Sequence, residues 1–194
     1  GASIEHSGPK VHFNTLIPED FDKVAEVFAG TVRHYNKGWG AGYKWNIKYW
    51  EIWNEPDNIV RKKGGIPSEI VDLTIASARI IKEVDPEAKI AAFGLAGPRR
   101  VAPNEAIISD LAKKLKANNE EYLIDWITYH GYQYIPEESY FTDGDSLRAI
   151  LKRHDYNVAI WQGECGAPSV GYMGGALSEC DWNEQTQAKW DIRK

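Results

Sequence analysis

The sequence predicts an α/β fold in which parallel strands alternate with helices. Short apolar segments recur along the chain, and a segment with helical spacing follows each of them. The strands are mostly continuous apolar runs, which is typical of strands buried on both faces of a parallel sheet. Such a chain fits an open doubly wound sheet or a (β/α)8 TIM-type barrel. A barrel would be partial, because about five strands cannot close an eight-stranded one.

Five strands are expected, each short and rich in apolar or aromatic residues. They cover residues 2–6, 47–53, 88–94, 122–129 and 157–163. The expected helices cover residues 18–36, 67–84, 104–118, 145–154 and 181–194. Pro18 suits a first helical turn, Asp85-Pro86 stops the second helix, and Asn104 is the predicted cap of the third. No repeat or linker interrupts this series, so residues 1–194 are expected to form a single domain.

Composition narrows the function classes. The chain has 194 residues, of which 43% are hydrophobic and 26% charged, as in one globular domain. A net charge of −5 and the lack of a basic stripe argue against a nucleic-acid partner. No apolar run reaches the roughly 18 residues that span a membrane. No signal peptide is visible at Gly1, so the localisation stays unknown, and a secreted or periplasmic protein remains compatible. Cys165 and Cys180 are compatible with one bridge or with two free thiols.

Two glutamates at predicted strand ends are the strongest candidates for chemistry. The run YWEIWNEPDN places Glu55 after the second strand, and AIWQGECGAPS places Glu164 after the fifth. The carboxyl ends of barrel strands meet at one rim, where catalytic residues lie. A lone strand-end glutamate would more simply be a solvated loop residue or a helix cap. Two opposed carboxylates, however, are the machinery of glycoside hydrolysis.

These segments resemble clan A glycoside hydrolases, and glycoside hydrolase family 39 most of all. WNEPD is similar to the acid/base motif of the clan. IIKEVDPEAKI, AAFGLAGP, DWITYHGY and EQTQAKW are similar to successive segments of family 39, so the likeness covers nearly the whole chain. WQGEC stands at the expected nucleophile strand, with Gln-Gly-Glu-Cys in place of the family's Thr-Glu-Trp pattern. In this clan the acid/base ends strand four and the nucleophile ends strand seven. Glu55 and Glu164 likewise lie three predicted strands apart, which implies a partial barrel holding strands three to seven.

The resemblance implies a retaining glycosidase that acts on a β-glycosidic bond of a plant-type or microbial polysaccharide or oligosaccharide. Glu164 is expected to attack the anomeric carbon, while Glu55 protonates the leaving oxygen and then serves as base for water. No cofactor is expected. No metal is expected either, because the histidines show no paired ligand spacing.

Further residues are candidates for binding the carbohydrate substrate. They are Asn54, His130, Tyr132, His6 and Trp161. Tyr132 and His130 follow the fourth strand and are candidate hydrogen-bond donors near Glu164. Asn54 fits a donor to the sugar 2-hydroxyl. Each of the five also has a simpler alternative role as a core, turn, loop or rim residue.

Two other functions stay open. A barrel without strands one, two and eight would have two exposed parallel edges, which could pair in a homo-oligomer. The chain would then be a catalytically incomplete, carbohydrate-binding fragment that needs the missing strands or a partner chain. The other alternative is an open-sheet α/β enzyme unrelated to sugars. The strand offset between the two glutamates argues against it.

Overall fold

The computed structural model describes residues 16–138, 142–171, 176–178 and 181–193. The predicted first strand at residues 2–6, and with it His6, lies outside these ranges. Within them, four strands form one parallel sheet: β1 (Tyr49–Ile52), β2 (Lys89–Leu95), β3 (Trp126–His130) and β4 (Ala159–Glu164). The α-helices are α1 (Phe21–Lys37), α2 (Pro56–Lys63), α3 (Pro67–Val84), α4 (Val101–Asn118), α5 (Asp145–Arg153) and α6 (Glu184–Arg193).

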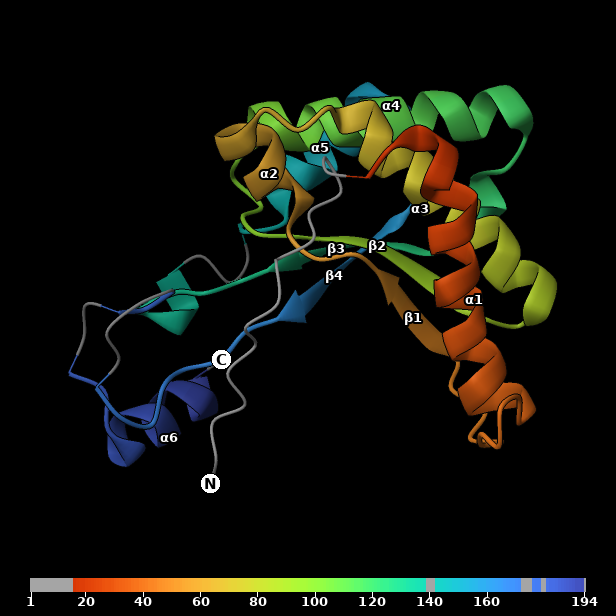
Figure 1. The fold of residues 1–194 in the computed structure, drawn as a ribbon. Coiled ribbons are helices and arrows are strands. Elements are labelled where there is room, and N and C mark those ends of the chain that lie inside the picture. The colour runs from red at the N-terminus through yellow and green to blue at the C-terminus, as the bar shows by residue number, and fades with distance from the viewer. Residues whose placement is uncertain (1–15, 139–141, 172–175, 179–180, 194) are drawn as a thin grey trace.

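The order of the strands decides between the two predicted architectures. A doubly wound sheet reverses its strand order at a switch point and carries helices on both faces. Here the spatial order is β1-β2-β3-β4, the same as along the chain. Figure 1 shows α2, α3, α4 and α5 on one side of the sheet. This is the arrangement in a sector of a (β/α)8 barrel, so the partial-barrel fold is confirmed and the doubly wound alternative is wrong.

The hydrophobic core lies between the sheet and these helices. Ile90 and Leu95 of β2 are fully buried, as are Ile107 and Leu111 of α4. Each such side chain contributes about 1.5–3 kcal/mol when it is removed from water. This layer fixes the strands from which the loops at the carboxyl end of the sheet project.

Helix α1 packs against the core through one face. Its buried apolar residues recur at helical spacing: Phe21, Ala25, Ala29 and Val32. The helix contacts α3 and ends at Gly38, whose φ of 75° forms a left-handed cap. Near the end of this helix, the Asn36 side chain makes the two backbone hydrogen bonds that a neighbouring strand would otherwise make with Ile47. The Asn36 side chain donates to the carbonyl oxygen of Ile47 and accepts from the N–H of Ile47, both at 2.7 Å, which guides the chain into β1.

The opposite face of the sheet differs from the prediction. Both edge strands, β1 and β4, expose residues on this face, including Tyr49 (61% exposed) and Trp161 (47% exposed). These two rings pack with Trp126, and the Trp126 and Trp161 ring centroids lie 4.2 Å apart in a stacked arrangement. Burial on both faces is therefore wrong for the edge strands. The described sheet has no strands opposite it to cover this face.

Several element boundaries also differ. No helix is expected between residues 53 and 67, but α2 forms there directly after β1. The helix α4 begins at Val101, so Asn104 lies inside it and is not its cap. The Asn104 side chain instead donates to the carbonyl oxygen of Gly97 at 2.9 Å. β3 begins at Trp126, after a short 3-10 turn (Glu121–Leu123). Among the described residues, no helix is both long and apolar enough to cross a bilayer.

Candidate active site

Glu55 and Glu164 come together at the carboxyl end of the sheet, with His130 between them. Glu55 follows β1, His130 ends β3 and Glu164 ends β4. One side-chain oxygen from each glutamate and one ring nitrogen of His130 all lie within 4.8 Å of one another. Retaining glycosidases hold their two carboxyl groups about 5–5.5 Å apart. The strand offset read from the sequence therefore brings two acids to a catalytically useful separation.

His130 contacts both acids. Its side chain is almost completely buried, whereas those of Glu55 and Glu164 are 31% and 46% exposed. The His130 Nδ1 atom lies 2.9 Å from Glu55 Oε1 and 3.6 Å from Glu164 Oε1. An imidazole nitrogen that bears a proton can donate to either carboxylate. His130 thus belongs to the site, although it is buried like a core histidine.

Tyr132 is bound to the second acid, as its place after the fourth predicted strand suggests. Its hydroxyl donates to Glu164 Oε1 at 2.5 Å. Burial and this hydrogen bond to Glu164 raise the pKa of Tyr132 to about 12. The phenol therefore stays protonated at neutral pH. Its charge-assisted hydrogen bond holds the Glu164 carboxylate in one orientation.

Glu55 stands at the amino-terminal cap position of α2, but its carboxylate caps no backbone N–H. Instead, Asn58 Nδ2 donates to Glu55 Oε2 at 2.7 Å. The φ of Glu55 is 52° and that of Trp53 is 72°, a left-handed conformation that few non-glycine residues adopt. The Glu55 N–H donates to the carbonyl oxygens of Phe93 and Gly94 at 3.1 and 3.0 Å. Glu55 thus holds the cap position of α2 through its backbone, while its carboxylate binds Asn58 and His130 instead.

The end of β2 supports this arrangement through an irregular backbone. Its register with β3 shifts here, and Phe93 has a φ of 95°. Gly94 has a φ of 51°, and a Cβ at this position would lie 2.9 Å from His130 Nε2 and 3.2 Å from Glu51 Oε1. Strained residues of this kind cost about 1–3 kcal/mol each and gather at functional sites. Only glycine leaves room for His130 and Glu51 at this point.

Glu51 is a third carboxylate near His130, and it is not among the predicted site residues. It lies in β1, where it accepts a hydrogen bond from the Thr128 hydroxyl. Thr128 Oγ1 in turn accepts from the Gly94 N–H at 3.0 Å. The available signal was strand alternation, which places residues 49, 51 and 53 on one face. A charged residue within that run indicates a polar face.

A hydrogen-bond network next to Glu55 was also not predicted from the sequence. Arg100 Nη1 lies 2.7 Å from Asn58 Oδ1 and 3.0 Å from Asp57 Oδ2. Asp57 is fully buried and also accepts from the Ala96 N–H at 2.8 Å. The loop after β2 thus fixes the first turn of α2, and Asn58 points its amide at Glu55. The polar pair Asp57-Asn58 after Pro56 was the only signal in the sequence.

Other predicted residues are not brought to the acids. Asn54 is exposed beside Glu55. Trp161 packs with Trp126 and does not line the cavity at Glu55. Cys165 is a free, exposed thiol, whereas Cys180 and His6 lie outside the described residues.

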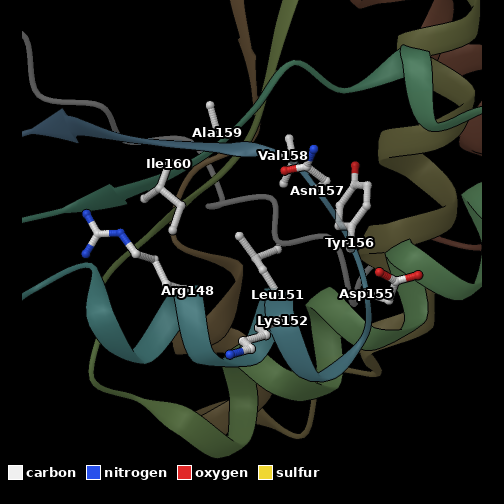
Figure 2. Close-up of a pocket in the computed structure, with 9 residues that line it drawn as sticks. All are labelled: Arg148, Leu151, Lys152, Asp155, Tyr156, Asn157, Val158, Ala159 and Ile160. Carbon is white, nitrogen blue, oxygen red and sulfur yellow. The ribbon is translucent and has the colours of Figure 1, made fainter.

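Two hollows lie at different places on the sheet. A cavity of about 670 Å³ opens at the carboxyl end, and Glu55, His130 and Tyr132 line it. A second, of about 470 Å³, lies beside the amino end of β4. Figure 2 shows its nine lining residues, which come from α5, the following turn and β4. Asp155 is the one acid among these nine, and none is a histidine. Of these two hollows, only the first is lined by one of the two paired acids, Glu55.

The same three side chains could hold a divalent metal ion, since an imidazole and two carboxylates are suitable ligands. Their oxygens already have proton-bearing partners, however. Tyr132 donates to Glu164 and Asn58 donates to Glu55.

The fold is similar to that of solved glycosidases. A glucosidase from Croceicoccus marinus matches with a TM-score of 0.63 and 22% identity, over 78% of this chain and 32% of its own. A family 39 β-xylosidase from Caulobacter crescentus matches with a TM-score of 0.49 and 16% identity, over 80% and 31%. A family 44 endoglucanase from Clostridium thermocellum gives 0.48 and 13%, over 84% and 44%. No protein-family model and no curated protein matches the chain.

The likeness to the glucosidase concerns the fold. Four parallel strands and their helices form part of a glycosidase-type barrel. The expected likeness to barrel-type glycosidases is thus confirmed for the fold. The chain spans 32% of the length of that glucosidase.

Proposed function

We propose that residues 1–194 are a partial β/α-barrel catalytic domain of a retaining glycoside hydrolase, which cleaves a β-glycosidic bond in a plant-type or microbial polysaccharide or oligosaccharide. One observation carries the proposal: Glu55 and Glu164 offer carboxylate oxygens within 4.8 Å of each other at the carboxyl end of the sheet. That separation leaves no room for a water molecule between the second acid and the sugar. It therefore favours a covalent glycosyl intermediate over direct attack by water.

Each acid would have one role in each step. In the first, a Glu164 oxygen bonds to the anomeric carbon while the bond to the leaving oxygen breaks, and Glu55 gives that oxygen its proton. In the second, Glu55 takes a proton from water, the water oxygen bonds to the anomeric carbon, and Glu164 is released. The half-exposed Glu164 is accessible to a sugar, and Tyr132 holds it in place.

The surrounding residues would hold the reacting groups. His130 would bridge the two acids through its Nδ1 atom. Asn54, beside Glu55, would donate to the sugar 2-hydroxyl. Trp161, which packs with Trp126, remains a proposed carbohydrate-binding residue. His6, which lies outside the described residues, also remains one.

The test is the hydrolysis of aryl β-glycosides whose leaving groups differ in acidity. Glu164→Ala is expected to abolish turnover on all of them. Glu55→Ala is expected to spare substrates with acidic phenols, because such leaving groups need little protonation. Glu121→Ala removes an exposed carboxylate near the amino end of β3 and is the matched control. Turnover by Glu164→Ala at the wild-type rate, or equal losses for Glu55→Ala across the series, would contradict these roles.

A second function is favoured by the two edges of the described sheet. The chain spans 32% of the glucosidase, and β1 and β4 are the two edges of the described sheet. A carbohydrate-binding fragment, completed by further strands or by a partner chain at these edges, would bind saccharides without product. Saccharide titration together with a product assay separates the two functions. Light scattering would test whether copies of the chain pair through the edges.

A further inference from the structure

The cavity beside Glu55 has an unusual charge for this protein. The chain as a whole carries a net charge of −5. Yet Lys62 of α2 and Arg99 and Arg100 of the loop after β2 all line this cavity, which we call the basic cavity. Glu55 is its one acidic lining residue. An anion would therefore find a local excess of positive charge at this place.

The three cations are not equivalent. Arg100 is held by the buried Asp57 and by Asn58, so its charge is largely balanced within the protein. Lys62 and Arg99 are exposed. Among the described residues, no acid forms an ion pair with either of them. Their charges are therefore available to a ligand.

The position of the basic cavity relative to the two acids indicates what it would hold. Glu55 lines it, whereas Glu164 does not. A sugar attacked by Glu164 would leave its departing group on the side of the proton donor, Glu55. The departing group would therefore extend into the basic cavity.

We infer that the basic cavity is the subsite for the leaving group and takes a saccharide unit that bears a carboxylate, a hexuronosyl residue. The planar guanidinium of Arg99 presents paired donors that match a carboxylate, and the Lys62 ammonium adds a point charge. This inference rests on the proposed function, because only the role of Glu55 makes the cavity a leaving-group site. A sulfate ester would offer the same negative charge, so the experiment must separate the two anions.

Direct binding tests the inference without requiring turnover. Trimers of galacturonate and of glucuronate would be titrated into the wild-type chain calorimetrically, at neutral pH and low salt. The probes for comparison are the methyl ester of each trimer, which has the same length without charge, and a neutral trisaccharide carrying sulfate esters. We expect at least one acid trimer to bind about tenfold or more tightly than its ester, with an affinity that falls as salt is added.

Charge-removing variants locate the contact. Lys62→Gln and Arg99→Gln are each expected to weaken binding of that trimer about three- to tenfold. Arg61→Gln removes the same charge from the neighbouring residue of α2, which does not line the cavity. It should leave the affinity within about twofold. Thermal melting of each variant confirms that the exposed substitutions leave the fold intact.

Three results would overturn the inference. The first is equal affinity for the acid trimers and their esters, including no measurable binding of either. The second is a loss of affinity in Arg61→Gln equal to that in Lys62→Gln and Arg99→Gln. The third is tighter binding of the sulfated probe than of the acid trimers. Failure of the proposed function would show in a different measurement. The chain would then fail to hydrolyse aryl glycosides, while the acid trimers would still bind more tightly than their esters.

Discussion

The two ends of the sheet use acidic residues in opposite ways. At the amino end, Asp125 precedes β3 and is fully matched by donors. Its Oδ2 accepts from the Ile90 N–H at 2.9 Å and from Lys82 at 3.2 Å, and its Oδ1 accepts from Lys89 at 2.9 Å. Burial alone would raise the pKa of Asp125, but the hydrogen bonds from Ile90, Lys89 and Lys82 lower it below its ordinary value.

At the carboxyl end, two acids face each other instead of facing cations. Glu55 and Glu164 share His130, and the neighbouring backbone carries strained residues such as Phe93. Lys62 and Arg99 line the cavity beside Glu55, and no acid among the described residues forms an ion pair with either of them. Asp125 at the amino end is thus paired with lysines within the fold. Among the described residues, neither Glu55 nor Glu164 at the carboxyl end forms an ion pair with a lysine or arginine. This division agrees with the usual roles of the two ends of a barrel.

The largest expected effect is on activity at the carboxyl end. Glu164→Gln should reduce turnover by about 10⁴-fold or more, because loss of a nucleophile removes the covalent route. Steady-state hydrolysis of an activated aryl glycoside measures it. The melting temperature should stay near that of the wild type, since Glu164 is half exposed. A large fall in melting temperature would show that Glu164 is a structural residue.

The next effect is on stability in the core. Ile90→Ala should lower the free energy of unfolding by about 2–5 kcal/mol, because Ile90 is fully buried and a cavity would remain. Urea denaturation measures the change. The core lies on the helix side of the sheet, so saccharide affinity measured on the folded variant should not change. A loss below about 1 kcal/mol would mean that this core relaxes around the gap.

A smaller stability effect is expected at the amino end. Asp125→Asn should lower the free energy of unfolding at pH 7 by about 1.5–3 kcal/mol, the usual contribution of charged hydrogen bonds. Because the folded-state pKa of Asp125 is lowered, its stabilisation is present above the ordinary value of about 3.9 and is lost as pH falls through the lowered value. Unfolding curves at pH 7 and at about pH 2 would show whether the difference disappears in acid. An undiminished difference there would contradict the pairing, and turnover should be unaffected.

The last effect, which is absent at neutral pH, is the alkaline titration of Tyr132. Its folded-state pKa of about 12 lies above the ordinary value of about 10. The protonated phenol therefore stabilises the fold fully below about pH 10, and this contribution is lost as pH rises through about 12. Tyr132→Phe lacks this titration, so the wild type should lose stability relative to the variant over that window. Parallel curves for both proteins would contradict the assigned hydrogen bond.

Much of the fold was readable from local signals. The helix predicted at residues 67–84 matches α3, because Pro67 suits its first turn and Asp85-Pro86 ends it. The meeting of Glu55 and Glu164 was also predictable, since strand order and the carboxyl-end rule suffice.

What the sequence did not reveal depends on contacts between distant segments. The Arg100–Asn58 contact joins the loop after β2 to α2, and the Glu51–Thr128 contact joins two strands. No residue type in the sequence marks the positive φ of Phe93, because phenylalanine does not favour this conformation. The exposed face at Tyr49 and Trp161 depends on what lies opposite the sheet, which local patterns do not encode.

The most direct test of the carboxyl end as a catalytic centre is covalent trapping. The chain would be incubated with 2-deoxy-2-fluoro β-glycosides of several sugars, each with an activated leaving group, and digested for mass spectrometry. A retaining mechanism predicts one fluoroglycosyl group per chain, attached to Glu164. An adduct on another residue, or hydrolysis with inverted configuration and no adduct, would contradict the assignment of Glu164 as the nucleophile.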